Sequence, residues 1–355
     1  MKIEVAVHAR MSERGSSLLR LIQNNNMPIL DLFVRESIQN SLDAGLEGSG
    51  PVHIDINVRE FYSTRLNRHF EGIQHNLNRK YPEGKYKLLE IRDSNTTGLT
   101  GPLCQQNVKG NNFGNILKLV YEISMPQQKE GAGGSWGLGK TVYFRMGIGL
   151  VIYYSRVKLE DGTFQSRLAA CLVEDETRED ALLNNYTDKH RRGIAWWGRE
   201  IGQNETVPVT DNSEIELLLS DLNIRPYEGT ETGTTIIIPY ISESALLEGI
   251  LPAGESIIKP WWISTVENYL KVAVQRWYAP RLNNESYPYG RWLTVRVNGK
   301  TISIHNMLPL FRVIRSLYMK TPISGKDARN NDILEGAEVY SERVNLRNIL
   351  ALYQT

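Results

Sequence analysis

Three things are scarce in this sequence: cysteine, long apolar runs and net charge. The two cysteines, Cys104 and Cys171, lie far apart with no metal-ligand spacing around them, which predicts reduced thiols rather than a disulfide framework or a zinc site. No apolar run approaches the roughly 20 residues of a membrane helix, and the first residues lack the apolar core of a signal peptide. These absences predict a soluble, cytoplasmic protein with no membrane partner.

The charges nearly cancel. Lys and Arg total 41 against 40 Asp and Glu, which gives a formal charge of +1. Such a chain has no strong overall field toward nucleic acid or an anionic membrane, so composition lends no support to a DNA partner. The 355 residues, 41% of them hydrophobic, are enough for two domains with ordinary cores.

Hydrophobic periodicity predicts a mixture of helices and strands. Strands are expected at 2–8, 51–60, 86–92 and 234–239, with hairpins over 150–173 and 292–304, and helices at 27–44, 113–124 and 263–278. Polar segments near 61–84 and 174–230 look like insertions, and the second is expected to be irregular although it holds Trp196-Trp197. The domain boundary is expected near 241–262.

The segment GSWGLGKT, residues 134–141, matches the pattern G-x-x-x-x-G-K-[ST] of a phosphate-binding P-loop. A P-loop follows directly from a buried strand and opens a helix. Here the preceding residues 125–133 are polar and rich in Gln and Gly, and no strand pattern enters the loop. The P-loop therefore remains the weaker of two explanations for this glycine run.

A helix near the N-terminus carries a carboxylate and an amide at helical spacing. Glu36 and Asn40 are four residues apart and Asp43 is three further on, so all three side chains share one helix face. A carboxylate there can activate a water, and an amide oxygen can ligate magnesium beside phosphate oxygens. The other interpretation is a solvated helix face, but the same helix also has a dense apolar face that must pack closely.

Two further positions suggest a site for a base. Asp93 ends a predicted strand and precedes a turn-rich loop, where a buried carboxylate can accept a hydrogen bond from an exocyclic amine such as that of adenine. Gly233-Thr234 opens a β-branched strand, where a threonine can bond a buried water or a base edge. Taken alone, an Asp before a turn and a strand beginning with Thr are both common.

Taken in order, these motifs resemble the GHKL ATPase superfamily, which includes gyrase B, MutL, MORC proteins, a heat-shock chaperone branch and histidine kinases. The resemblance covers about residues 1–240 and is nearest to the MutL and MORC branches. It implies an α+β class, a two-layer α/β sandwich (the Bergerat ATP-binding fold) as domain 1–240, and a smaller α/β transducer-like region over 241–355. Helix 263–278 and the Val297-Asn298-Gly299-Lys300 turn resemble the early part of such a region.

The resemblance also implies roles for individual residues. Glu36 is expected to be the general base and Asn40 the Mg²⁺ ligand, with Asp43 and Ala44 completing the helix motif. Asp93 is expected to bind the adenine amine, although Asn95 replaces the first glycine of this second motif and Gly98 comes one residue late. The phosphates are expected at the glycine run, and ATP is expected to contact Gly134, Trp136, Gly137, Leu138, Gly139, Lys140, Thr141 and Thr234.

The function implied is magnesium-dependent binding and slow hydrolysis of ATP, with a lid over about 98–133 that closes on the nucleotide. Closure would switch conformation or drive homodimerisation through the N-terminal strand, in a DNA-transaction or defence-type system. Two alternatives stay open: a non-hydrolysing ATP sensor that gates a DNA or protein partner, and a chaperone-like protein. Fold alone does not choose among them, because this superfamily supports several unrelated functions.

Overall fold

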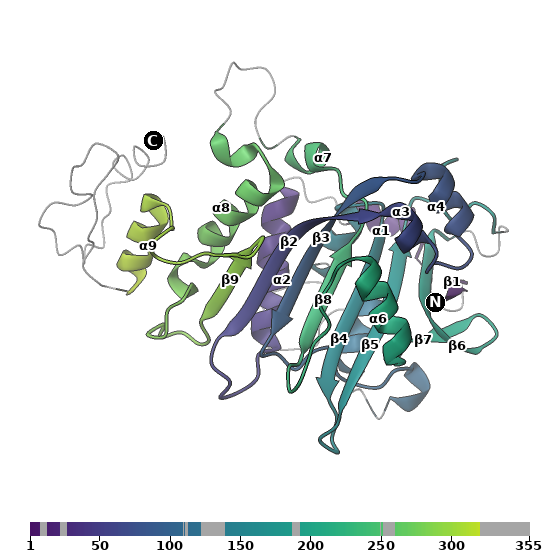
Figure 1. Ribbon diagram of the computed structural model, residues 1–355, viewed down its shortest axis with the longest axis horizontal. Helices are drawn as coiled ribbons and strands as arrows, with labels where there is room; N and C mark the ends of the chain where they lie inside the picture. The colour runs from purple at the N-terminus through teal and green to yellow at the C-terminus, as the bar shows by residue number, and fades with distance from the viewer. Residues whose placement is uncertain are drawn as a thin grey trace, which may run out of the picture.

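The computed structural model describes residues 1–7, 13–21, 27–108, 110, 113–121, 139–186, 192–248, 250 and 260–319. These residues form one large mixed sheet with helices on both faces (Figure 1). The strand order is β1-β6-β5-β4-β8-β3-β2-β9-β10, and β7 pairs with β6. The strands are β1 Lys2–Val5, β2 Val52–Tyr62, β3 Lys85–Ser94, β4 Leu150–Lys158, β5 Phe164–Val173, β6 Ile194–Gly202, β7 Glu205–Val207, β8 Gly233–Ile238, β9 Leu293–Val297 and β10 Lys300–Thr301.

Strand β8 holds the centre of the sheet. Its residues Ile236, Ile237 and Ile238 are buried, and it pairs antiparallel with both β3 and β4. Alternate side chains point to opposite faces, so Ile236 and Ile238 join the core under one helix layer while Ile237 joins the core under the other. A strand buried on both faces explains its continuous β-branched run.

The first helix layer lies behind the sheet in Figure 1 and contains α2 Ile29–Asp43 and α8 Val266–Tyr278. Leu30, Phe33, Val34 and Ile38 recur at helical spacing along α2 and are fully buried against the sheet. The same layer receives α1 Gly15–Leu21, α5 Gly114–Ile116, the π-helix η2 Leu117–Tyr121 and the 3₁₀ helix η4 Gly139–Arg145. Short 3₁₀ turns η1 Gln105–Asn107, η5 Trp261–Ile263 and η6 Ala279–Arg281, and helix α7 Glu243–Leu247, complete the connections.

The opposite face is covered in part by α3 Ser63–Asn67, α4 Gln74–Lys80 and α6 Asn212–Asp221. Leu66 on α3, Phe70 between the two helices, Leu77 on α4 and Leu218 on α6 are buried against this face. In Figure 1, α6 lies in front of the sheet. These helices come from the polar segments 61–84 and 174–230, so apolar residues spaced within them provide a second cover for the sheet.

Residues 260–319 extend the same sheet. Strand β9 pairs in parallel with β2, and α8 packs beside α2 (Figure 1). The β9–β10 turn contains Asn298 with φ 47° and Gly299 with φ 74°, the two positive angles that a tight type I′ hairpin needs. Helix α9 Pro309–Met319 follows.

The α+β class predicted from the sequence is confirmed: a mixed sheet is covered by a helix layer that includes the predicted helix 27–44. The expectation that 174–230 is irregular is wrong. It contains β6, which pairs with β1 and β5 in the sheet, and Trp196 and Trp197 are fully buried on opposite faces of that strand. Among the described residues, no helix is long and apolar enough to span a membrane.

Candidate functional site

The carboxyl end of β3 meets the carboxyl end of α2 beside the first residues of β8. Asp93, the penultimate residue of β3, points toward the α2 layer, as do Leu89 and Ile91 on the same strand. Backbone bonds fix the junction: Thr97 N donates to Ala44 O at 2.8 Å, and Leu46 N donates to Asn95 O at 2.9 Å. Helix, strand and turn therefore converge on one carboxylate.

Asp93 is buried and accepts three hydrogen bonds. Ser41 Oγ donates to Oδ2 at 2.8 Å, while Thr96 Oγ1 and the Thr234 backbone N–H donate to Oδ1 at 2.5 and 2.9 Å. Burial raises the pKa of the Asp93 carboxyl, and the three donors and Arg92 oppose that shift. A carboxylate has about four acceptor positions, and the described residues fill three of them, which leaves one on the Oδ2 side.

The turn after Asp93 depends on two residues with left-handed backbone. Asn95 has φ 61°, and its side chain amide donates to Pro51 O at 2.9 Å. Asn is one of the few residues other than glycine that tolerate such a backbone conformation. Gly98 has φ 68°, and a Cβ there would lie 2.7 Å from both Arg156 O and Ser155 Oγ. The close approach explains why glycine is needed at 98.

The β8 start belongs to the same junction. Thr234 contributes its backbone N–H to Asp93, and its side chain lies on the sheet face of Ile236, toward α2. Gly233 packs so closely that a Cβ would meet Asp93 O at 2.2 Å. Ser155 Oγ on β4 donates to Gly233 O at 2.7 Å and accepts from Leu99 N at 2.8 Å. Asp93, Asn95, Gly98 and Thr234, all singled out in the sequence, therefore lie together.

Glu36 and Asn40 lie on α2 and are half-buried. Arg35 donates to Glu36 Oε1 from Nη2 at 2.8 Å, and the Glu36 side chain is 21% exposed. Arg35 also lies over the ring of Trp277 on α8, 5.7 Å from the ring centroid, and Tyr278 Oη donates to Arg35 O at 2.8 Å. Helix α8 thus fixes the segment of α2 that carries Glu36.

Asp43 occupies the last turn of α2. It is exposed and its carboxylate accepts from Gln39 Nε2 at 2.9 Å. The glycine run is largely outside the described residues: this holds for Gly134, Trp136, Gly137 and Leu138, and for the Lys140 side chain. The description resumes at Gly139, which begins η4, and Thr141 on that helix is fully buried.

Three residues that sequence inspection missed complete the junction: Ser41, Thr96 and Tyr143. Tyr143 on η4 is fully buried, and its hydroxyl accepts a 3.1 Å hydrogen bond from Ser37 Oγ on α2. Ser41 directly follows Asn40 and Thr96 follows Asp93 by three, so both were adjacent to recognised motif residues. No local sequence pattern marks Tyr143, because its contact with α2 depends on how η4 packs in the fold.

The donor set fits a magnesium ion held mainly by a nucleotide. Mg²⁺ usually takes one or two protein oxygens and completes its shell with waters and phosphate oxygens. Asn40 offers one amide oxygen, and Glu36, the residue expected to be the general base, lies one helical turn away on the same face. A bound Mg²⁺ would neutralise phosphate charge at this end of the site.

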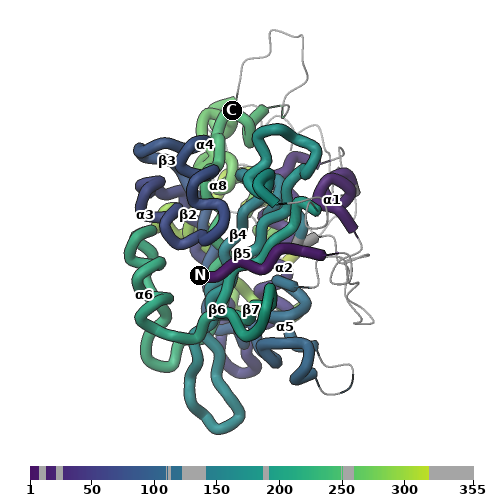
Figure 2. The backbone as a smooth tube through the Cα atoms, turned by 90° about the vertical axis from the view of Figure 1, so that its right-hand side faces the viewer, coloured from purple at the N-terminus to yellow at the C-terminus, as the bar shows by residue number. Residues whose placement is uncertain are grey.

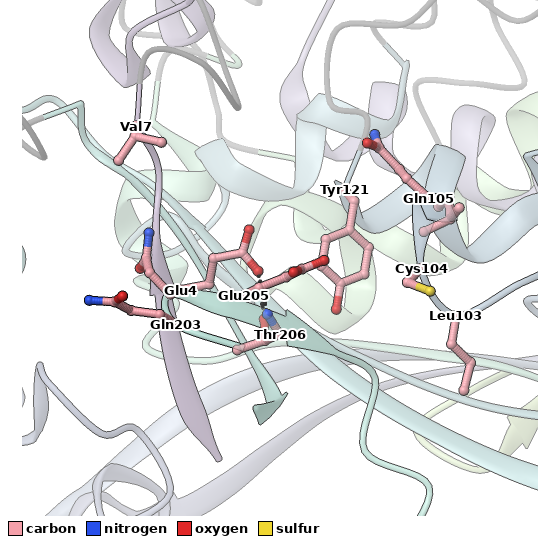
Figure 3. A pocket seen from close by; sticks show the side chains of 11 residues that line it. Glu4, Val7, Leu103, Cys104, Gln105, Tyr121, Gln203, Glu205 and Thr206 are labelled. Carbon is pink, nitrogen blue, oxygen red and sulfur yellow. Dashed lines mark hydrogen bonds between the residues drawn. The ribbon is translucent and has the colours of Figure 1, made fainter. Parts of the chain in front are cut away.

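A separate cavity of about 260 Å³ lies between strands β1 and β7 and the segment 103–121 (Figure 3). Glu4 and Glu205 line one side, with Cys104, Gln105 and Tyr121 across from them. Glu4 Oε2 accepts from the backbone N–H of Thr206 at 2.7 Å. The residues lining this cavity include none of those predicted to bind nucleotide.

Protein-family models give no match to this sequence, and no curated protein matches it. Among solved structures, the chain is similar to the ATPase region of Saccharomyces cerevisiae topoisomerase II bound to ICRF-187 (dexrazoxane), with 10% identity and a TM-score of 0.39 over 82% of this chain and 54% of that one. A second structure of that ATPase region gives 10% identity and a TM-score of 0.38, over 81% and 52% of the two chains. The chain spans about half the length of these solved chains.

Proposed function

We propose that this chain is a magnesium-dependent ATPase of the GHKL type, with a Bergerat-type nucleotide site between α2 and the ends of β3 and β8. The observation that carries the proposal is the Asp93 junction. It brings the helix motif, the aspartate motif and the Gly-Thr motif, which are far apart in the sequence, to one buried carboxylate.

Asp93 has the properties of a receptor for the adenine amine. It is buried, three donors hold it in one orientation, and one acceptor position stays open on the Oδ2 side. An exocyclic amine would fill that position. A base without an amine at this position would leave the buried carboxylate unsatisfied in the complex, which costs binding free energy. The site would therefore discriminate against such bases.

Glu36 and Asn40 belong to the phosphate end in this proposal. Glu36 would take the proton of the attacking water, and Asn40 would supply an oxygen to the metal ion. The glycine run would serve the phosphates, as its sequence motif predicts, and the described part of the chain resumes directly after it at Gly139, the first residue of η4.

Nucleotide binding would act as a conformational switch. Helix α8 contacts the segment of α2 that carries Glu36, so a shift of α2 on binding would be passed to α8. Strand β1 pairs with β6 along its full length and lies at the outer edge of the sheet (Figure 2). Exchange of this edge strand between two copies would give an ATP-dependent homodimer. A MutL-like or MORC-like role in a DNA-transaction or defence-type system is the form of this proposal that the sequence motifs favour.

The test is ATP turnover by the purified chain with Mg²⁺. Glu36→Ala should reduce hydrolysis about 10²- to 10⁴-fold, because it removes the base, while ATP still binds. Glu47→Gln, an exposed acidic residue beyond the end of α2, is the matched control and should hydrolyse ATP like the wild type. Undiminished turnover by Glu36→Ala would remove the assignment of the base.

The Arg35–Glu36 ion pair supports a second candidate function. Its 2.8 Å contact occupies one oxygen of the proposed base, as expected for a subunit that binds ATP and gates a partner without hydrolysing it. The same assay distinguishes the two candidate functions. An ATP sensor would bind ATP tightly and show no hydrolysis that depends on Glu36.

A further inference from the structure

Arg167 on β5 is a buried cation whose hydrogen-bond partners are all neutral. Its side chain belongs to a residue that is only 4% exposed, and its acceptors among the described residues are Gln165 Oε1 and two backbone carbonyl groups. Burial lowers the pKa of Arg167 to about 10, so the guanidinium stays protonated at neutral pH. Burying a cation without an acidic partner costs folding free energy, so the contacts that this one makes call for an explanation.

The two carbonyl groups belong to the turn that follows Asp93. Nη1 of Arg167 donates to Leu99 O and to Gly101 O, both at 2.8 Å. Nε donates to Gln165 Oε1 at 3.0 Å, and this bond orients the guanidinium from its own strand. One nitrogen atom therefore fixes two carbonyl groups of the turn relative to β5.

Arg167 lies on the face of the sheet that carries the proposed nucleotide site. The strand register pairs Ser155 on β4 with Thr234 on β8 and with Arg167 on β5, so the three residues form one row across the sheet. Ala169, two positions further along β5, joins the core under α2, and alternation places Arg167 on that same face. The row begins beside Asp93, which accepts from the Thr234 backbone N–H.

The turn connects Arg167 to Asp93 through hydrogen bonds. Ser155 Oγ accepts from Leu99 N at 2.8 Å, so side chains of the sheet bind both backbone polar groups of Leu99. Three residues earlier in the turn, Thr96 Oγ1 donates to Asp93 Oδ1 at 2.5 Å. A turn released at Leu99 would shift Thr96 and with it the donor that orients the Asp93 carboxylate.

We propose that Arg167 is a positioning residue for the base end of the proposed nucleotide site. It holds the turn at Leu99 and Gly101, and the turn orients Asp93 through Thr96. The inference rests on the proposed function and deepens it, because it gives a task to a residue outside the four sequence motifs. An arginine suits this task, since one planar group with several donors can bind two carbonyl groups and a neighbouring side chain at once.

The variant to test is Arg167→Met, which keeps an unbranched side chain and removes the donors. Calorimetry measures the binding of ADP and of adenosine. We expect both affinities to fall by about tenfold, within the range of coupling found among residues of one hydrogen-bond network. The factor should be the same for the two ligands, because the change acts at the base. A loss for ADP that is absent for adenosine would show that the charge acts on phosphates, and would overturn the inference.

Arg156→Met is the matched control. Nη1 of Arg156 on β4 also donates to two backbone carbonyl groups, Gly229 O at 2.7 Å and Glu231 O at 3.1 Å. Arg156 directly follows Ser155, so its side chain points to the opposite face of the sheet. Its loss should leave the affinity for ADP unchanged, and a tenfold loss in this variant as well would overturn the specific role of Arg167.

Calorimetry also separates positioning from a purely structural role. A variant that only folds less completely shows a lower binding stoichiometry with an unchanged dissociation constant, and that result for Arg167→Met would overturn the inference. Arg167→Lys is a milder variant, because its ammonium group ends one atom short of Nη1 and should bind one of the two carbonyl groups. It should weaken ADP binding by about threefold. Wild-type affinity in this variant would overturn the inference even where Arg167→Met does not fold.

Asp93→Asn gives the test of the route. If Arg167 acts through Asp93, Arg167→Met should lose most of its tenfold effect in the Asp93→Asn background, because the carboxylate that it positions is already absent. The full effect in that background would overturn the inference. Wild-type protein that binds ADP, with Arg167→Met equal to it, would refute the inference alone, whereas no binding of ADP by the wild type would refute the proposed function.

Discussion

Ser41 Oγ on α2 lies 2.8 Å from Asp93 Oδ2 at the end of β3, and both residues are buried. This hydrogen bond joins the helix that carries Glu36 and Asn40 to the carboxylate proposed to bind adenine. The same hydroxyl lies 3.1 Å from Ser37 O, one turn earlier on α2, but its single hydrogen can be donated fully to only one of these two acceptors. The two ends of the proposed nucleotide site are thereby connected through one short side chain.

Ser41→Ala should destabilise the fold and weaken nucleotide binding. It removes one donor from a buried carboxylate, which costs about 1.5–3 kcal/mol of unfolding free energy. Ser264→Ala is the control, because its hydroxyl has neutral partners among the described residues: it donates to Trp261 O at 2.6 Å and accepts from Asn268 Nδ2 at 3.0 Å, and its loss should cost about 1 kcal/mol. Urea unfolding of the two variants measures the difference, and equal losses would contradict the role given to the Ser41–Asp93 bond.

Adenine nucleotide affinity should fall with decreasing pH because of Asp93. Burial raises the pKa of this carboxyl, so it takes up a proton at a higher pH than a free aspartate does. A protonated oxygen no longer accepts from the adenine amine, so affinity is lost as pH falls through the raised pKa. Binding of ADP measured from pH 8 to pH 5 should decline more steeply for the wild type than for Asp93→Asn, which shares every other titration. Parallel profiles would argue against Asp93 as the base receptor.

Gly98→Ala should be far more damaging than Gly48→Ala. Both glycines have positive φ, 68° and 72°, but a Cβ at 98 meets backbone oxygen at 2.7 Å whereas a Cβ at 48 meets nothing within 4 Å. The strain common to both is about 1–2 kcal/mol. The clash should bring the cost at 98 above about 3 kcal/mol, and thermal unfolding of both variants checks the difference. A similar loss of stability in the two variants would mean that the turn after Asp93 can shift to accommodate a Cβ at position 98.

The junction of α2 with α8 should depend on Asp31. This buried carboxylate accepts from the Tyr269 hydroxyl, from Arg276 Nη1 at 2.6 Å and from Trp277 Nε1 at 2.7 Å. Asp31→Ala removes a buried carboxylate that accepts from three donors, the Arg276 guanidinium among them, and should cost about 3–5 kcal/mol.

Asp55→Ala is the control for Asp31→Ala. The pair Asp55–Arg296 joins β2 and β9 at the surface, where a single ion pair contributes about 1 kcal/mol or less. Equal unfolding free energies for the two variants would show that Asp31 does not stabilise the packing of α8 on α2.

Periodicity and turn chemistry were enough to predict most strands but only some of the helices. The alternating run 51–60 and the hairpin over 150–173 appear as β2, β4 and β5, and Asn298-Gly299 forms the expected tight turn. These signals are local, since side-chain alternation and positive φ depend on near neighbours only. The prediction that the segment around Trp196 is irregular was wrong. The polar residues before and after β6 masked a short strand whose first residues are buried on both faces of the sheet.

The site was predictable only where its residues follow a spacing. Glu36 and Asn40 share a helix face, and Asp93 lies at the end of a strand, so each could be singled out alone. The hydrogen bonds of Asp93 with Ser41 and Thr234 span 52 and 141 residues, which depends on strand order and cannot be seen in a local pattern. For the same reason Tyr143, 106 residues from Ser37, went unrecognised.

Equilibrium binding of ATP to the wild type, Glu36→Ala and Asp93→Asn, with hydrolysis followed in the same samples, tests the central claim most directly. The wild type should bind and hydrolyse ATP, and Glu36→Ala should bind without hydrolysing. Asp93→Asn should bind about 10- to 100-fold more weakly, the loss expected for one hydrogen bond to a charged group. Equal ATP affinity in the wild type and Asp93→Asn, or no ATP binding by the wild type, would contradict a nucleotide site between α2, β3 and β8.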